Sequence, residues 1–161
     1  MKLYLVQHAE AKGEQEDPVR PLSQKGWRDL EKVSIFLQGK AIRVSRILHS
    51  GKLRAKQTAE KLSEVVHCSE GVEETDGLAP LDDATKWGDR SREQTDDVML
   101  VGHLPHLSKL AGLLLAGDPN RTVIDFKMGG VVCLERDEKG NWCVGWMIIP
   151  QVLCRVSSQN D

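Results

Sequence analysis

Short apolar runs alternate with amphipathic stretches along most of the chain. Continuous apolar runs occupy residues 3–6 and 98–101, and a second strand fits residues 46–49, in which Ile47 and Leu48 are apolar. Runs of four to six residues without polar alternation are typical of strands buried on both faces of a parallel sheet. Helices are predicted over 24–38, 52–66, 82–94 and 105–116, a short strand near 70–74, and two strands over 130–135 and 142–148.

The helix over 24–38 has the clearest boundaries. Ser23 is a suitable N-cap, and Gly39 is well placed to end the helix. Its apolar stripe is predicted to contain Trp27, Leu30, Ser34 and Leu37, with Val33 and Phe36 beside it.

Strands that alternate with helices predict an α/β fold. We expect a single-domain three-layer sandwich over residues 1–161, with a mainly parallel central sheet and helices on both faces. The turn at 137–140 joins two strands, which predicts an antiparallel hairpin at one edge of the sheet.

Composition and charge exclude several classes of protein. The chain is 40% hydrophobic and 29% charged, and its net charge of −2 argues against a role in coating nucleic acid. Its apolar stretches are too short for a membrane span, and its first residues do not resemble a signal peptide, so we expect a cytoplasmic protein with no membrane partner. Residues 20–61 contain eleven Lys and Arg against three Asp and Glu, and residues 62–97 contain the reverse. Charge alone leaves open whether the basic segment serves an anion or is a solvated face.

The cysteines predict no metal site and no structural disulfide. Cys68, Cys133, Cys143 and Cys154 lack the spacing of zinc ligands, and His103 with His106 lacks a third and a fourth ligand. We expect reduced thiols, with Cys133 and Cys143 facing each other across the hairpin as a reduced pair.

Three predicted strands end in residues that suit phosphoryl chemistry. The first ends in Gln7 and His8, the second in His49 and Ser50 with Arg54 following, and the third in Gly102 and His103. Ligands of open α/β sheets bind beyond the carboxyl ends of the strands, where these side chains would converge. Imidazole can act as a nucleophile near neutral pH, and guanidinium binds phosphoryl oxygens well.

These segments resemble the signatures of the histidine phosphatase superfamily. Residues 5–10 are similar to its Arg-His-Gly signature, residues 50–60 to its Ser-Pro-x-x-Arg-Ala-x-Gln-Thr-Ala signature, and residues 101–105 to the signature with the second histidine. Residues 19–26, Val-Arg-Pro-Leu-Ser-Gln-Lys-Gly, resemble the loop of the SixA-type protein phosphohistidine phosphatases. The sequence departs from the superfamily pattern at three positions, with Gln7 for Arg, Ala9 for Gly and Gly51 for Pro. It leaves open whether Arg20 supplies the charge that Gln7 lacks.

The resemblance implies a metal-independent phosphatase without a cofactor. His8 would attack phosphorus and form a covalent phosphohistidine, while Arg54 and His103 would hold the phosphoryl oxygens. Gln7, Arg20 and Leu104 are expected to complete the phosphate site.

The spacing of the signatures bears on the substrate. Only residues 61–102 separate the second signature from His103, which is too few for the long lid that carries a general acid in other branches. A site without that acid favours cleavage of a P–N bond, so we expect a phosphohistidine-bearing protein, such as a phosphotransfer domain, as the partner.

Two alternatives stay open. One is a small-molecule phosphomonoesterase, which needs an acid from Asp76, Asp82 or Asp83. The other is a catalytically impaired module that binds phosphate or phosphohistidine, because Gln7 replaces the usual arginine.

Overall fold

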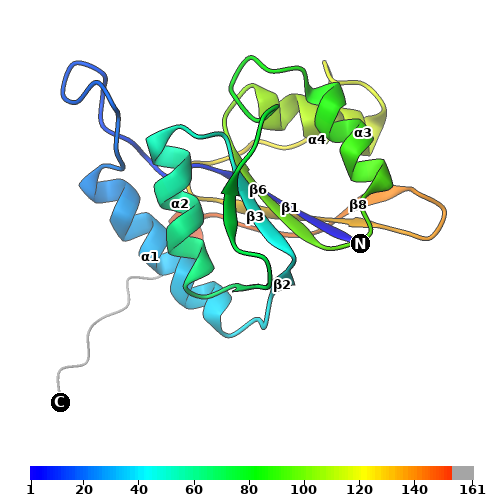
Figure 1. The fold of residues 1–161 in the computed structure, drawn as a ribbon, viewed down its shortest axis with the longest axis horizontal. Coiled ribbons are helices and arrows are strands. Elements are labelled where there is room, and N and C mark those ends of the chain that lie inside the picture. Colours follow the sequence, from blue (N-terminus) through cyan, green and yellow to red (C-terminus); the bar gives the residue numbers. More distant parts are fainter. Residues whose placement is uncertain (154–161) are drawn as a thin grey trace.

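A computed structural model of the chain describes residues 1–153 and contains a six-stranded mixed sheet with helices on both faces (Figure 1). The sheet has the order β5-β3-β6-β1-β7-β8. Its strands are β1 (Lys2–Gln7), β3 (Arg46–His49), β5 (Val72–Glu74), β6 (Val98–Gly102), β7 (Val131–Arg136) and β8 (Trp142–Ile148). The helices are α1 (Gln24–Gln38), α2 (Leu53–Ser63), α3 (Ala84–Glu93), α4 (His106–Ala116) and a 3-10 turn, η1 (Pro150–Val152).

The sheet is parallel on one side of β1 and antiparallel on the other. Strands β5, β3, β6 and β1 are parallel, with Gln7 of β1 opposite Gly102 of β6. Strand β7 pairs antiparallel with β1 and with β8, so the predicted α/β class and edge hairpin are confirmed. Because β3, β6 and β1 are parallel neighbours, the residues that follow them meet at one edge of the sheet.

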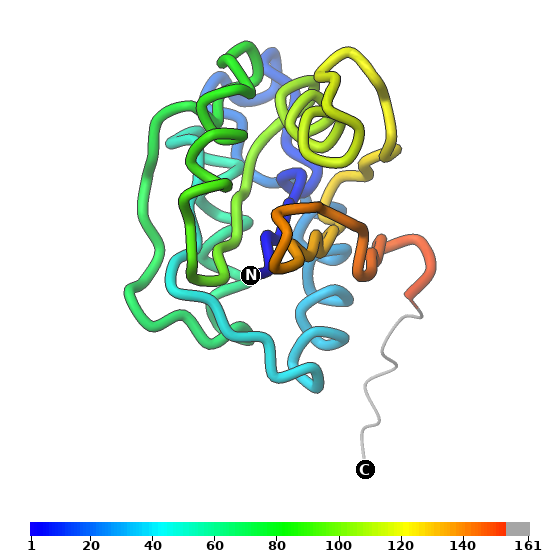
Figure 2. Tube along the Cα trace, turned by 90° about the vertical axis from the view of Figure 1, so that its right-hand side faces the viewer, coloured from blue at the N-terminus to red at the C-terminus, as the bar shows by residue number. Residues whose placement is uncertain are grey.

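Each face of the sheet has its own hydrophobic core. Tyr4 and Val6 of β1 point to the core under α1 and α2, while Leu3 and Leu5 point to the core under α3 and α4. Figure 2 shows the resulting layers, with α4 in yellow-green at the top, α1 in light blue at the bottom, and the blue β1 and orange hairpin between them.

Helix α1 begins and ends as predicted, but its buried face is rotated. The Ser23 side chain accepts a hydrogen bond from the Gly26 N–H, and Gly39 caps the other end. Trp27 is 40% exposed, which corrects its predicted place in the apolar stripe. The inward position is Gly26, because a Cβ atom there would lie 2.1 Å from the Glu10 carbonyl oxygen.

The region between α1 and β5 contains a feature that the sequence did not predict. Strands β2 (Arg43–Val44) and β4 (His67–Cys68) form a separate parallel pair of two residues each. Helix α2 ends at Ser63 and not near 66, because the chain turns there to enter β4.

The hairpin register separates the two cysteines that we expected to face each other. Cys133 is buried opposite Trp146, whereas Cys143 is exposed opposite Glu135, with a register shift between Cys133 and Leu134. The predicted pairing of Cys133 with Cys143 is therefore wrong. Cys68, Cys133 and Cys143 are free thiols, and Cys154 lies outside the described residues.

The helices are short, and α1 with 15 residues is the longest within residues 1–153. None of these helices combines the length and the hydrophobicity needed to cross a lipid bilayer.

Candidate active site

Two histidines and an arginine meet at the carboxyl edge of the parallel strands. His8 follows β1, His103 follows β6, and Arg54 lies in the first turn of α2, which comes after β3. The imidazole centroids of His8 and His103 are 4.8 Å apart, and Arg54 Nε lies 3.3 Å from His8 Nε2. The convergence expected from the strand ends is thus present in the fold.

Backbone contacts fix the orientation of His8. Its Nδ1 lies 2.7 Å from the Ala9 carbonyl oxygen, which can only accept, so Nδ1 carries the proton. Its Nε2 is then the unprotonated nitrogen, and it faces Arg54. Burial, reinforced by the positive charges of Arg54 and Arg20, lowers the pKa of His8 to about 4 despite the opposing bond to Ala9. His8 is therefore a neutral imidazole at pH 7, and the lone pair of its Nε2 accepts a hydrogen bond from the Arg54 Nε–H.

His103 forms the other side of the site. Its side chain is 2% exposed, and Nε2 lies 2.6 Å from the Ser50 hydroxyl at the end of β3. Burial, followed by the charges of His8 and Arg54, lowers the pKa of His103 to about 3. Within residues 1–153, its Nδ1 has no hydrogen-bond partner. The Ser50 contact joins two neighbouring strand ends at the site.

Thr58 connects the loop after His8 to helix α2, which carries Arg54. Its hydroxyl accepts a hydrogen bond from the Ala9 N–H at 3.0 Å and donates one to the Arg54 carbonyl at 2.7 Å. The residue is completely buried. Sequence reasoning did not single out Thr58 or the Ser50–His103 contact, although Thr58 and Ser50 lie in the segment 50–60 that carried the second signature.

Gln7 and Arg20 are two further residues expected at the site, and both lie near His8. Gln7 is only 8% exposed, and its Oε1 has no hydrogen-bond partner among residues 1–153. Arg20 is partly exposed in the loop 8–23, and its Nε donates to the Lys12 carbonyl at 3.1 Å. Its charge contributes, after burial, to the lowered pKa of Arg54 as it does to that of His8. The positive charge of Arg20 therefore acts electrostatically on both His8 and Arg54.

The loop that carries Arg20 is tied to the scaffold. The Lys12 N–H donates to the Pro21 carbonyl, and the Leu22 N–H donates to Gln57 Oε1 on α2, both at 2.8 Å. Arg20 itself has a φ angle of 51°, in the left-handed region that non-glycine residues seldom occupy. Such strain persists only where the surroundings hold it in place.

Leu104, expected near the phosphate, follows His103 directly and is partly exposed. It precedes α4, whose first N–H groups point toward the same end of the sheet. A helix N-terminus of this kind favours an anion nearby.

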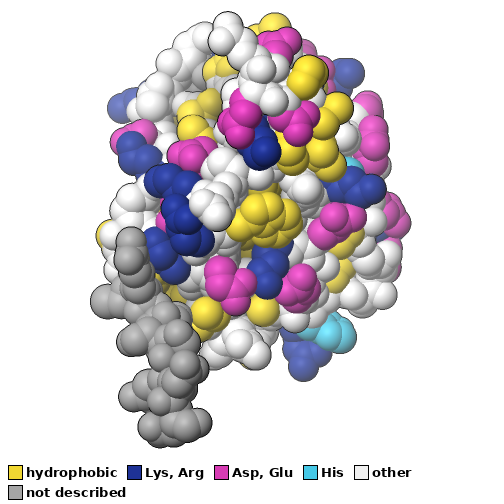
Figure 3. Space-filling model, turned by 90° about the vertical axis from the view of Figure 1, so that its left-hand side faces the viewer, with side chains coloured by type: hydrophobic (Ala, Val, Ile, Leu, Met, Phe, Trp, Pro, Cys, Tyr) yellow, Lys and Arg dark blue, Asp and Glu magenta, His cyan; other side chains and the backbone are white. Residues whose placement is uncertain are grey.

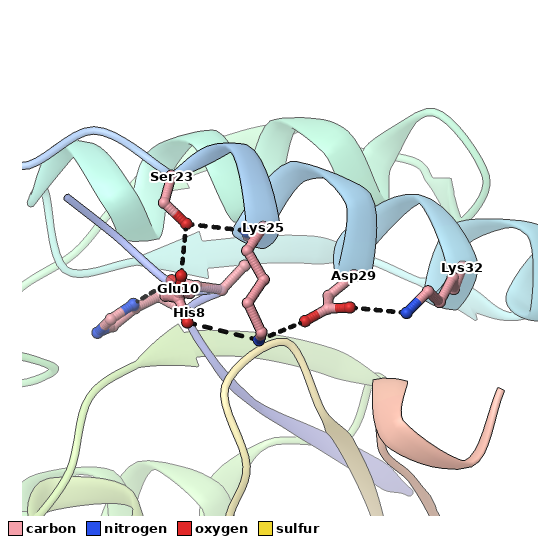
Figure 4. A network of polar contacts seen from close by, with 8 residues as sticks. His8, Glu10, Ser23, Lys25, Asp29 and Lys32 are labelled. Carbon is pink, nitrogen blue, oxygen red and sulfur yellow. Dashed lines mark hydrogen bonds and ion pairs between the residues drawn. The ribbon is translucent and has the colours of Figure 1, made fainter. Parts of the chain in front are cut away.

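Four carboxylates near the site, those of Glu10, Asp76, Asp82 and Asp83, have partners of their own. Glu10 accepts from the Ser23 hydroxyl and pairs with Lys25, which pairs in turn with Asp29, as Figure 4 shows. Asp82 accepts from the Ala79 N–H at 2.8 Å, and Asp83 accepts from the Thr85 N–H at the start of α3.

Asp76 binds the Arg90 guanidinium at 2.8 Å. With Glu74, Asp82 and Ser50 it lines a shallow depression, and Ser50 in turn contacts His103. None of the three aspartates proposed as an acid is thus free of a partner.

Five of the eleven basic residues in 20–61 form ion pairs. Lys25, Lys32, Arg46, Lys56 and Lys61 pair with carboxylates. Figure 3, which views the side of the molecule at the left of Figure 1, shows Lys and Arg side chains interspersed with acidic and hydrophobic ones. Six basic residues of 20–61 make no ion pair within residues 1–153, namely Arg20, Arg28, Lys40, Arg43, Lys52 and Arg54.

Within residues 1–153, no group of three or more His, Cys, Asp and Glu side chains is arranged to hold a metal ion. His106, the candidate second ligand beside His103, is fully buried on α4.

Comparisons with known proteins place this site in a family. The chain is 26% identical over 155 residues to the phosphohistidine phosphatase SixA of Escherichia coli (strain K12), with 93% of this chain and 94% of SixA covered. It is 32% identical over 141 residues to an uncharacterized protein of Picosynechococcus sp., with 83% of this chain and 84% of that protein covered. No family model matches the chain.

A solved structure of a SixA protein also matches the chain. The protein histidine phosphatase SixA complexed with tungstate superimposes with a TM-score of 0.79 at 25% identity, covering 94% of this chain and 98% of that one. The curated relative and the solved structure together support a phosphatase. The chain belongs to the histidine phosphatase superfamily and is SixA-like.

Proposed function

We propose that the protein is a SixA-like phosphohistidine phosphatase that forms a covalent phosphohistidine on His8. The observation that carries this proposal is the state of His8, which has a protonated Nδ1 held by the Ala9 carbonyl and an unprotonated Nε2 that accepts a hydrogen bond from the Arg54 Nε–H. A neutral imidazole with a fixed orientation is what in-line attack on phosphorus requires.

The reaction has two steps. In the first, the lone pair of His8 Nε2 forms a bond to phosphorus, and the P–N bond of the substrate breaks with its electron pair going to the leaving imidazole, which takes a proton from solvent. In the second, a water oxygen attacks phosphorus, the bond to His8 Nε2 breaks, and the water proton passes to solvent as inorganic phosphate leaves. Each step moves negative charge onto the phosphoryl oxygens.

Arg54, His103 and Arg20 stabilise that charge. Arg54 lies beside the attacking nitrogen, and His103 closes the opposite side of the site. A bound phosphoryl dianion raises the pKa of a nearby imidazole, so His103 gains donor capacity when substrate is present. The positive charge of Arg20 supports phosphate binding where Gln7 supplies none. This scheme uses no metal ion and no cofactor.

We propose the class of substrate from the state of the candidate general acids, which other side chains hold. An alkoxide leaving group needs a proton donor worth about 10²–10⁴ in rate, whereas the imidazole of phosphohistidine leaves without one at the site. Glu10 is held by Ser23 and Lys25, and Asp76 by Arg90, so neither is free to serve as that donor. A protein that carries phosphohistidine, such as a phosphotransfer domain, is therefore the proposed partner, and a phosphomonoester is disfavoured.

Phosphate release from a phosphohistidine peptide tests the proposal. We expect release with the natural protein and none with His8→Ala, while His67→Ala, which changes an exposed histidine, keeps full activity. A phosphoserine peptide of the same sequence should give a rate at least a hundredfold lower.

Equal or faster release from the phosphoserine peptide would contradict P–N specificity and indicate the phosphomonoesterase. Binding of the phosphohistidine peptide without release would identify an impaired module, for which the buried, unpartnered Gln7 would be the cause.

A further inference from the structure

A second cavity lies away from the candidate active site, on the face of the sheet covered by α1. It has a volume of about 500 Å³ and is bounded by the amino end of β1, the residue before β6, the end of α1 and β8. Figure 2 shows the end of α1 and the loop after it, in light blue to cyan, below the orange hairpin. The volume is within the range of about 300–1,000 Å³ that is usual for small-molecule sites.

Three aromatic side chains line this cavity. Tyr4 is buried and lies 6.0 Å from Trp146 between ring centroids, with the planes tilted by 57°. Trp146 and Phe36 are only half-buried, so each leaves part of its ring open toward the cavity. Partly exposed aromatic surface in a concave site favours a planar apolar ligand that stacks on it.

The rim of the cavity is basic. Lys2, Lys40 and Arg43 line it, and Lys40 and Arg43 are among the cations that make no ion pair within residues 1–153. Lys40 lies 4.7 Å from the centroid of the Phe36 ring. The one carboxylate of the lining, Asp97, already accepts a hydrogen bond from the Lys2 backbone N–H. The cavity thus combines aromatic walls with an excess of positive charge, because three cations of the lining face one carboxylate.

We propose that this cavity binds a planar aromatic ring that carries an anionic group, a ligand of the size of a nucleoside monophosphate. The ring stacks against Trp146 and Phe36, and the anion contacts Lys40 and Arg43. Tyr4 in the cavity and His8 in the active site are four residues apart in sequence, a span of about 13 Å along an extended chain. The two sites are therefore separate, and this one is independent of the phosphatase reaction.

Calorimetric titration with adenosine 5′-monophosphate tests the proposal. We expect binding of equal strength in the natural protein and in Arg54→Ala, because the catalytic pocket is not used. The double variant Lys40→Glu/Arg43→Glu should bind at least tenfold more weakly. A charge-matched control, Lys109→Glu/Lys139→Glu, changes two exposed lysines outside the cavity and should bind like the natural protein.

Further titrations test the aromatic ring and the anionic group of the ligand separately. Adenosine and inorganic phosphate, each titrated alone into Arg54→Ala, should bind at least tenfold more weakly than the nucleotide. Trp146→Leu should also weaken nucleotide binding by about tenfold, which reports loss of stacking. Far-ultraviolet circular dichroism checks that this variant is folded.

Three outcomes would overturn the proposal. They are nucleotide binding that Arg54→Ala abolishes, binding that Lys40→Glu/Arg43→Glu leaves unchanged, and no binding heat at millimolar nucleotide.

Discussion

Thr58 and Ala9 are joined by a hydrogen bond of 3.0 Å that links helix α2, which carries Arg54, to the loop that begins at His8. The same buried hydroxyl donates a hydrogen bond to the Arg54 carbonyl, so it acts both as an acceptor and as a donor. The distance between His8 and Arg54 is therefore set by a side chain that touches neither reacting atom.

Replacing Thr58 with Val should impair catalysis. The substitution keeps the shape of the side chain but leaves the buried Ala9 N–H without its acceptor, which costs about 1–3 kcal/mol of folding free energy. We expect kcat to fall about tenfold or more with KM little changed, because His8 and Arg54 lose their alignment. Thr58→Ser restores the hydroxyl and should recover most of the rate. Equal kcat for the Val and Ser variants would show that the bond has no positioning role.

The lowered pKa values predict how the histidines respond to acid. With pKa values of about 4 and 3, His8 and His103 stay neutral to pH 5, where an ordinary histidine is mostly protonated. In the unfolded chain both titrate near pH 6.5. The unfolded state thus binds more protons between about pH 6.5 and 4, so the free energy of unfolding falls as pH is lowered through this window.

Nuclear magnetic resonance of the imidazole Cε1–H groups checks this prediction. The signals of His8 and His103, assigned with the two Ala variants, should not move between pH 7.5 and 5, while that of the exposed His67 provides a comparison. Midpoints above pH 6 for both histidines would contradict the account of the site.

Gln7→Arg should raise the rate of phosphohistidine hydrolysis. An arginine there adds a charge-assisted contact worth about 1.5–3 kcal/mol, which corresponds to a gain of roughly ten- to a hundredfold in kcat/KM. Arg20→Ala in the natural protein should lower kcat/KM by a similar factor, since it removes the cation that acts on both His8 and Arg54.

The double variant Gln7→Arg/Arg20→Ala tests whether Arg20 compensates for the arginine that Gln7 replaces. If Arg20 stands in for the missing arginine, the loss caused by Arg20→Ala is smaller in the Gln7→Arg background than in the natural protein. Strictly additive effects in this cycle would mean that Arg20 has a different role.

Gly26→Ala should destabilise the fold although alanine favours helices. The new Cβ atom would lie 2.1 Å from the Glu10 carbonyl oxygen, and a backbone atom cannot move aside cheaply. We expect a loss of about 1–3 kcal/mol or more in urea unfolding. Gly13→Ala is the control, because no atom lies within 4 Å of its added Cβ. A neutral Gly26→Ala would show that α1 can shift away from the loop.

The two hairpin cysteines should differ in reactivity. Cys143 is exposed, whereas Cys133 is buried and burial raises its pKa to about 11, so Cys133 has little thiolate at pH 8. In a Cys68→Ser/Cys154→Ser background, Ellman's reagent should modify Cys143 rapidly and Cys133 only after unfolding. Fast modification of two thiols in the native protein would contradict the register of the hairpin.

The elements and the meeting of His8, Arg54 and His103 followed from local signals in the sequence. Buried apolar runs located β1 and β6, and the rule for parallel strands placed the residues after them at one edge. The side-chain bonds of Thr58 and Ser50 could not be foreseen, because they depend on how α2 and β3 are oriented against loops distant in sequence.

The sequence predictions that the structure corrects also failed for local reasons. Helical periodicity treats Trp27 as a core residue, but the close approach of the Glu10 backbone leaves room only for Gly26 at the inward position. The hairpin turn pairs Arg136 with Trp142, which places Cys143 opposite Glu135 and not opposite Cys133. Strands of two residues, such as β2 and β4, carry no periodicity to detect.

The position of β1 in the sheet determines which parts of the site a local unfolding event can disturb. β1 is hydrogen-bonded along both edges, to β6 and to β7, and its residues from Leu3 to Gln7 are buried. Amide groups in such a strand exchange with solvent only when the whole fold opens, whereas a surface loop opens locally at much lower free energy. His8 directly follows β1 and is tied to β6 by its backbone N–H, so it stays in place as long as the sheet does, whereas a local opening of the loop can move Arg20 away and return it.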